Sequence, residues 1–191
     1  MTMYKGKFAK IIQFVVIAAL YAGLTITEQF AVGMTKDIIQ VRLSDALLIL
    51  PVFTPAAIPG LFAGCLISNY VIGCHIYDVI FGSVATLIGA IGTYLVRKHK
   101  FMAPVPPIII NMIVIPILFA YVYRYENPFW YFVVAIGVGE LIACGVLGIA
   151  LMLGLEDHKD SLFPGNDLKS SDKRSAADKE NKETTTQQEI K

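Results

Sequence analysis

The chain has 191 residues, of which 55% are hydrophobic and only 16% are charged, and its mean hydropathy is +0.62. Soluble domains carry about 25% charged residues, so this composition excludes an ordinary soluble protein and indicates an integral membrane protein. The net charge of +1 averages an apolar body with a charged end, because nine of the 15 acidic residues follow Leu155.

Five apolar segments are long enough to cross a bilayer, which takes about 20 residues in a helix. They comprise residues 11–27, 56–73, 76–96, 103–123 and 128–153. A sixth, shorter segment begins at SDALLILPVFT, where Ser44 or Asp45 can cap a helix and Pro51 can kink or end it. We therefore predict an all-α integral membrane protein, with a bundle of six transmembrane helices in residues 1–155.

Residues 156–191 are polar and lack periodicity, so we predict a disordered cytoplasmic tail. Six crossings place both ends of the bundle on one side of the membrane. Basic residues in short connections mark the cytoplasmic side. They occur before the first segment and between residues 76–96 and 103–123, as Lys5, Lys7, Lys10, Arg97, Lys98 and Lys100. This pattern predicts a multi-pass protein of the cell membrane with both termini in the cytoplasm.

Glu140 is the strongest candidate for a functional residue, because it lies about halfway along the last apolar segment. A carboxylate at the centre of a spanning helix costs ~2.5 kcal/mol or more, so it usually faces the bundle interior or a hydrated cavity. Gly137, Cys144 and Gly148 lie near it at helical spacing and form a small-residue face suited to close packing. The alternative is a structural hydrogen bond between helices.

Other polar or aromatic residues could contribute to a site near the outer face, and each also has a structural interpretation. An acid such as Asp78 in the first turn of a helix is favoured by the helix dipole, and Asp45 could be a helix cap. Asn69 and Asn111 could bridge helices, and Trp130 could be an interfacial anchor. The candidates for substrate binding beside Glu140 are Arg42, Asp45, Asn69, Asp78, Asn111 and Trp130.

The first segment contains two overlapping pairs of small residues four positions apart, Ala18 with Ala22 and Ala19 with Gly23. Such pairs permit close helix approach, either within the chain or to another membrane subunit. The spacing leaves both interpretations open.

Motifs for ATP hydrolysis, zinc proteolysis and serine hydrolysis do not occur in the sequence. Cys65, Cys74 and Cys144 lack metal-ligand spacing. A self-contained pump or an intramembrane hydrolase is therefore not expected, nor is a cofactor. A substrate-binding subunit and an ion- or proton-coupled carrier or channel, with Glu140 as the proton site, remain the two functional hypotheses.

Four sequence blocks resemble the QueT family, the substrate-binding S components of energy-coupling factor (ECF) transporters, which are proposed to take up queuosine precursors. The blocks are RLSDALLILPVFTPAAIPGLFAGCLISN (42–69), YDVIFGSVATLIGA (77–90), APVPPIIIN (103–111) and GVGELIACGVLG (137–148). The resemblance covers roughly residues 8–153. In this family we expect Glu at the position of Asp45, and the shorter side chain reaches less far.

The resemblance implies a six-helix S component that captures a small deazapurine, such as 7-aminomethyl-7-deazaguanine, near the outer face. Its first helix would dock through Ala18, Ala22 and Gly23 on the transmembrane coupling subunit EcfT, which works with two cytoplasmic ATPase subunits. A carboxylate can accept two N–H groups of the guanine edge, and a second acid would pair with the cationic aminomethyl arm. Glu140 and Asp78 are the candidates for these roles, in either order, with Asn69 and Asn111 completing the ring edge.

Overall fold

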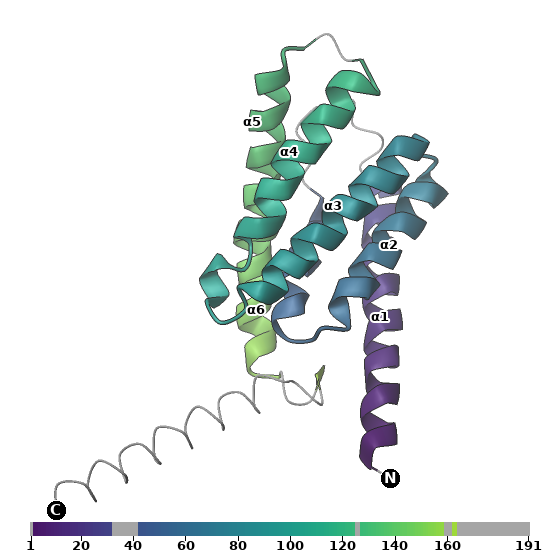
Figure 1. The fold of residues 1–191 in the computed structure, drawn as a ribbon, viewed down its shortest axis with the longest axis vertical. Coiled ribbons are helices and arrows are strands. Elements are labelled where there is room, and N and C mark those ends of the chain that lie inside the picture. Colours follow the sequence, from purple (N-terminus) through teal and green to yellow (C-terminus); the bar gives the residue numbers. More distant parts are fainter. Residues whose placement is uncertain (1, 32–41, 125–126, 159–161, 164–191) are drawn as a thin grey trace, which may run out of the picture.

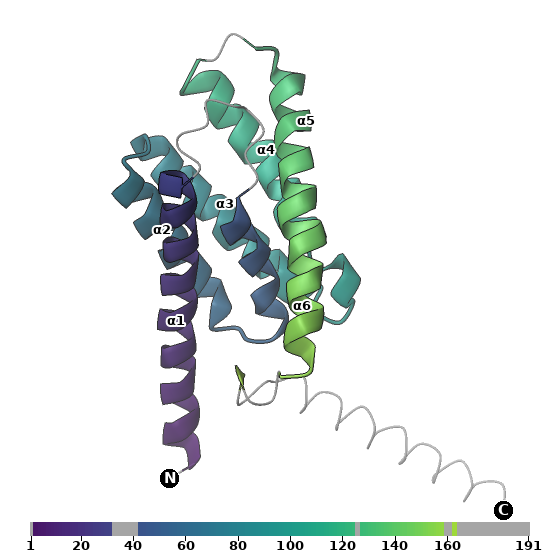
Figure 2. The same ribbon diagram turned by 180° about the vertical axis from the view of Figure 1, so that it is seen from behind.

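The computed structural model describes residues 2–31, 42–124, 127–158 and 162–163, with side chains from residue 8 onward. The regular elements in this part of the chain are all helical, which confirms the predicted fold class (Figure 1). In chain order they are α1 (Thr2–Ala31), the 3₁₀ helix η1 (Leu43–Val52), α2 (Ala57–Ile72), α3 (Ile76–Leu95), the 3₁₀ turn η2 (Lys100–Met102), α4 (Val105–Tyr121), α5 (Phe129–Glu140), the π-helical segment η3 (Leu141–Leu147) and α6 (Gly148–Glu156). The last three form one continuous rod (Figure 2).

Four of the helical stretches are long and apolar enough to cross a membrane: Phe8–Ala31, Ile76–Leu95, Lys100–Tyr121 and Phe129–Glu156. The helices η1 and α2 are apolar but shorter. Each of the six predicted segments thus corresponds to one helical stretch, and the chain is a multi-pass membrane protein. The start of α1 and the end of α6 lie at the same end of the bundle (Figure 1).

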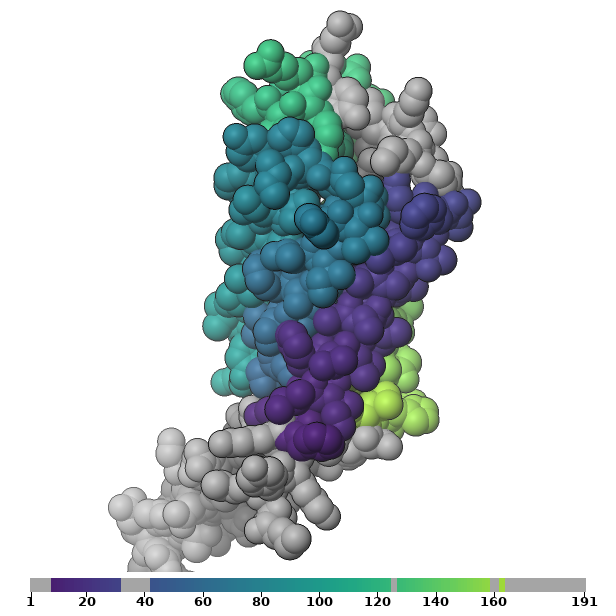
Figure 3. All heavy atoms as spheres, turned by 90° about the vertical axis from the view of Figure 1, so that its right-hand side faces the viewer, coloured from purple at the N-terminus to yellow at the C-terminus, as the bar shows by residue number. Residues whose placement is uncertain are grey.

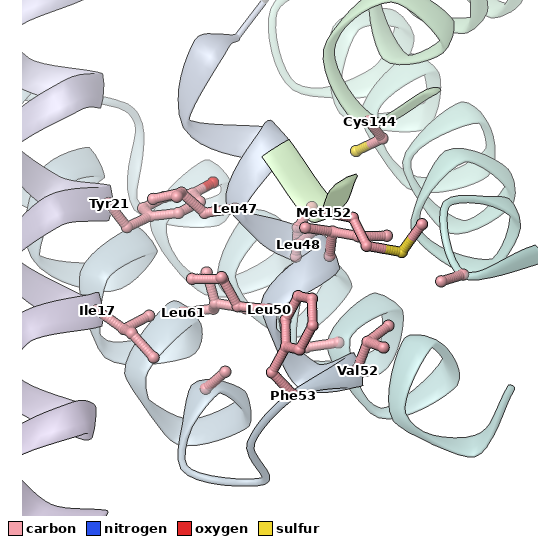
Figure 4. Close-up of a cluster of buried hydrophobic side chains, with 14 of the residues drawn as sticks. Ile17, Tyr21, Leu47, Leu48, Leu50, Val52, Phe53, Leu61, Cys144 and Met152 are labelled. Atoms are coloured by element: carbon pink, nitrogen blue, oxygen red, sulfur yellow. The ribbon is translucent and has the colours of Figure 1, made fainter. Parts of the chain in front are cut away.

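The short helix η1 lies in the middle of the bundle, and residues 44–52 are all buried. Its side chains pack with residues of α1, α2 and the last rod to form the main core (Figure 4). The labelled members of this core are Ile17, Tyr21, Leu47, Leu48, Leu50, Val52, Phe53, Leu61, Cys144 and Met152. Because η1 is mostly apolar and lies inside the bundle, this segment can be shorter than a full membrane span.

The predicted cap of η1 is wrong. Arg42 occupies the N-cap position, and no side chain caps the helix there. Asp45 instead accepts a hydrogen bond of 2.7 Å from the hydroxyl of Tyr21 on α1. The carboxylate is therefore committed to a contact between helices and not to its own helix end.

Small residues of α1 pack within the chain, against α2. A Cβ added to Gly64 would lie 2.8 Å from the carbonyl oxygen of Ala18, so the two helices approach too closely for any side chain there. Ala18 and Ala22 are both buried. This burial is at odds with the expectation that they dock on a partner, and Ala18 is used in the internal contact between α1 and α2.

The opposite face of α1 is uncovered along the side of the molecule (Figure 3). Val16 and Leu20 are about half exposed, at 49% and 50%, and Ala19 and Gly23 lie beside them on the exposed face. Nothing lies within 4 Å of a Cβ added to Gly23. Of the three residues predicted to dock, Gly23 alone is on this surface.

Most of the predicted polar tail lies outside the described residues. Among its described members, Leu162 and Phe163 contact the bundle. Phe163 is buried and stacks on Phe53 with ring centroids 5.4 Å apart, and the carbonyl oxygen of Leu162 accepts a bond of 3.4 Å from Nε2 of Gln13 on α1. The core thus includes a residue beyond the predicted boundary at Leu155.

Candidate functional site

A small cavity lies between η1, α3, α4 and α5. Ten residues line it: Arg42, Asp45, Asp78, Gly82, Thr86, Asn111, Ile115, Phe119, Ile136 and Glu140. Its volume of about 30 Å³ has room for one or two water molecules. A ring-sized ligand would therefore need the surrounding side chains to move apart.

Five of the seven residues predicted to bind substrate line this cavity. They are distant in the sequence, and the fold brings them together from four different elements. Arg42 and Asp45 come from the start of η1, Asp78 from the first turn of α3, Asn111 from α4 and Glu140 from the end of α5.

Glu140 is held by two donors, which explains how a buried carboxylate is tolerated in this helix. Its side chain is buried, with 7% exposed. Oε1 accepts a hydrogen bond of 2.7 Å from Nδ2 of Asn111, and Oε2 accepts one of 3.2 Å from the thiol of Cys144, four residues later. The first bond crosses from α4, so Glu140 both joins two helices and faces the cavity.

The helix changes from α to π geometry directly after Glu140. Single π-helical turns often mark functional sites, because the extra residue re-aims the side chains around it. Here the π-helical segment carries Cys144, whose thiol lies 3.1 Å from the carbonyl oxygen of Asp45 as well as near Glu140. Cys144 thus connects the last rod to η1 at the edge of the cavity.

Arg42 is positioned by Asn69, a fully buried residue of α2. One terminal nitrogen of the guanidinium donates a bond of 3.3 Å to Oδ1 of Asn69. Asn69 does not line the cavity itself, so the structure gives it a supporting position behind Arg42.

Acidic side chains outnumber basic ones in the lining of the cavity. Among these described residues, three are acidic, Asp45, Asp78 and Glu140, and one is basic, Arg42. A cation bound beside these carboxyl groups would favour their ionised forms, because opposite charges nearby stabilise each other. The arrangement favours a ligand that carries positive charge and hydrogen-bond donors.

The start of α3, whose first turn carries Asp78, lies toward the end of the bundle that is away from the start of α1 (Figure 1). Oδ2 of Asp78 accepts a bond of 3.1 Å from the hydroxyl of Tyr123, which follows α4. Burial and the Asp78 carboxylate raise the pKa of Tyr123, so its phenol remains a neutral donor. The Tyr123 ring packs edge-on against Phe119, which in turn packs against Phe132.

Trp130 does not belong to this site. Its side chain is 66% exposed at the start of α5, where it packs edge-on against Tyr131 with centroids 6.3 Å apart. An exposed tryptophan at the end of an apolar helix is typical of an anchor at the membrane interface.

Several residues of the site are not among those predicted from the sequence. Gly82 and Thr86 follow Asp78 at intervals of four residues, so one face of α3 could have been recognised from its spacing. Tyr21 and Tyr123, which bind Asp45 and Asp78, gave no such signal because their partners are far away in the sequence.

The comparisons with known proteins agree with the membrane fold. The family described as QueT transporter matches residues 11–157, which is most of the chain. The chain therefore belongs to the QueT transporter family. No curated protein and no solved structure matched significantly.

Proposed function

We propose that this member of the QueT transporter family is the substrate-capture subunit of an ECF-type importer and that it binds a cationic 7-deazapurine. The observation that carries the proposal is the cavity in which Glu140, Asn111 and Asp78 meet between α3, α4 and α5. The best candidate ligand is 7-aminomethyl-7-deazaguanine. Transport, and not catalysis, is the activity of the family to which the chain belongs.

The chemistry of the ligand complements the lining. The guanine edge has adjacent N–H donors, and a carboxylate can accept two of them in a charge-assisted pair. Glu140 suits this role because it is buried and already oriented by Asn111. The flexible ammonium arm would reach Asp78, which is only partly buried, near the end of the bundle. Phe119, Ile115 and Ile136 would contact the apolar body of the ring.

The cytoplasmic side of the protein is proposed to be the end that holds the start of α1 and the end of α6. Arg97, Lys98 and Lys100 lie in the connection between α3 and α4, and Lys100 forms an ion pair with Glu156 at the end of α6. Basic connections favour the cytoplasm. Asp78 and Tyr123 would then lie near the outer face, from which the ligand enters.

The uncovered face of α1 is the proposed docking surface for the coupling subunit EcfT, which would act with two ATPase subunits. We define this α1 face by Val16, Ala19, Leu20 and Gly23. Ala19 and Gly23 are four residues apart and allow a second helix to approach closely. Gly23 is retained from the predicted set, whereas Ala18 and Ala22 are replaced by Ala19 because they are buried.

A direct test is calorimetry on the purified chain with a panel of ligands. The panel contains 7-aminomethyl-7-deazaguanine, the neutral 7-cyano analogue, queuine and guanine. We expect the tightest binding for a ring with a cationic arm. A chain that binds none of the four would contradict the proposal.

A proton-coupled carrier is the second candidate, because two buried carboxylates, Asp45 and Glu140, line one cavity. The two functions make different predictions in cells. An ECF subunit co-purifies with a coupling subunit and two ATPases, and its uptake requires ATP. Uptake that stops when the proton gradient is dissipated while ATP is maintained would favour the carrier.

A further inference from the structure

Gly82 differs from the glycines that are required by helix packing. A Cβ added to Gly64 on α2, or to Gly92 on α3, would lie 2.8 Å from a backbone oxygen or 2.5 Å from a proline carbon. A Cβ added to Gly82 would instead lie 3.4 Å from Nδ2 of Asn69 and 3.5 Å from Oδ1 of Asp78, which is ordinary van der Waals contact. The fold therefore has room for alanine at this position.

Glycine inside a helix is destabilising relative to alanine, because it loses more conformational freedom on folding. Gly82 lies in the interior of α3, as the seventh residue of a helix of 20 residues. Neither packing nor backbone conformation accounts for it, since its φ is not in the left-handed region. The reason for a glycine here must lie in what its missing side chain leaves open.

The space beside Gly82 belongs to the cavity. Asp78 lies one turn before Gly82 on α3, Thr86 lies one turn after it, and all three line the cavity. The two atoms nearest to an added Cβ are polar atoms of Asn69 and Asp78. A methyl group would therefore project between the proposed cation partner and the residue that positions Arg42.

We propose that Gly82 is a specificity-determining residue, which lets a flat aromatic ring lie directly against the backbone of α3 within reach of Asp78. This inference rests on the proposed function and names the surface against which the ring lies. Ile115 and Phe119 contribute apolar lining from α4, the neighbouring helix. A ring between two such walls leaves no room for a methyl group, because close-packed sites do not absorb added volume without strain.

The test compares Gly82→Ala with the wild-type chain and with a control, Gly154→Ala on α6. Gly154 is also helical, and nothing lies within 4 Å of its added Cβ. The full chains are purified in detergent, and each is titrated with 7-aminomethyl-7-deazaguanine in a calorimeter. Thermal unfolding without ligand is measured on the same samples. We expect Gly82→Ala to unfold at or above the wild-type temperature and to bind at least ~10-fold more weakly. The control should bind like the wild type.

The other outcomes contradict either the role of Gly82 or the proposed function as a whole. Equal affinity of wild type and Gly82→Ala overturns the role of Gly82 and leaves the proposed function intact. Loss of binding together with a lower unfolding temperature, in Gly82→Ala but not in the control, also overturns it, since the glycine would then be required by the fold. A wild-type chain that binds no deazapurine overturns the proposed function and this inference with it.

Discussion

Nδ2 of Asn111 and Oε1 of Glu140 are joined by a hydrogen bond of 2.7 Å that links α4 to the last helical rod at the cavity wall. This bond satisfies a buried carboxylate and fixes the direction in which its second oxygen and its remaining lone pairs point. It is thus both part of the helix packing and part of the proposed ligand site.

Asn111→Ala should therefore affect stability as well as binding. Removing one donor from a buried acceptor costs about 1–3 kcal/mol, because the carboxylate is left incompletely satisfied. We expect a lower unfolding temperature for the ligand-free protein and weaker binding. A second variant, Asn111→Asp, keeps the shape of the side chain but places a second acid beside Glu140. It should be at least as destabilising at neutral pH, and a variant as stable as the wild type would contradict the role of this bond.

Asp78→Asn should change the ligand preference more than the stability. The substitution keeps the shape and removes the negative charge that we assign to the cationic arm. An exposed or half-exposed charge pair contributes little and a desolvated one contributes more, so we expect a loss of about 1–2 kcal/mol for the aminomethyl ligand. Binding of the neutral 7-cyano analogue should be nearly unchanged. Calorimetry with the two ligands measures the difference, and equal losses for both would exclude this role for Asp78.

Phe163→Ala should destabilise the protein, although Phe163 lies in the predicted polar tail. Phe163 is buried and stacks on Phe53 in the core. Large-to-small changes at buried phenylalanines cost about 3–5 kcal/mol, and a site near the chain end should fall at or below the lower limit. Leu162→Ala is the control, because that side chain is 50% exposed.

Truncation tests the same contact. A chain that ends after Phe163 should unfold at nearly the wild-type temperature, whereas one that ends after His158, which keeps the ion pair of Lys100 with Glu156, should unfold earlier. If the two truncated chains are equally stable in thermal unfolding, the contact of Phe163 with the core does not contribute to the fold.

Substitutions on the exposed face and on the buried face of α1 should have different effects, the first on assembly and the second on stability. Ala19→Leu with Gly23→Leu should block co-purification of the coupling subunit and uptake in cells, because bulky side chains prevent close helix approach. Ligand binding by the isolated chain should remain. Ala18→Leu should instead destabilise the chain itself, since Ala18 contacts α2.

Gly154→Leu on α6 is the control for bulk on an open helix surface. It should leave co-purification and uptake intact. Normal assembly of the doubly substituted α1 variant would show that the coupling subunit docks elsewhere.

The helices could be predicted from the sequence because a bilayer imposes a length of about 20 apolar residues on each span. The contact that Asp45 makes with Tyr21 could not be predicted from the sequence. A Ser-Asp pair before an apolar run is locally typical of a helix cap, and only the distant Tyr21 draws the carboxylate into a contact between helices. The contact of Phe163 with Phe53 could not be predicted either, because the neighbours of Phe163 in the sequence are mostly polar and indicate an unpacked tail.

The two small-residue pairs of α1 show most clearly that contacts between distant segments cannot be predicted from local spacing. Successive residues of a helix are rotated by about 100°, so Ala18 with Ala22 and Ala19 with Gly23 lie on neighbouring faces with the same spacing. Their spacing indicates that helices approach closely but not which helix approaches which face. The position of α2 decides this, because Gly60 and Gly64 pack against the face that carries Ala18.

The central claim is that Glu140 binds the ligand and does not merely join two helices. Glu140→Gln keeps the shape of the side chain but replaces one acceptor oxygen with a donor, which would face a donor of the ring. Breaking a buried charged pairing costs on the order of 2–5 kcal/mol. The most direct measurement is calorimetric titration of 7-aminomethyl-7-deazaguanine into the purified wild type and into Glu140→Gln. We predict that the variant folds and binds at least ~30-fold more weakly, whereas equal affinities would reduce Glu140 to a structural hydrogen bond.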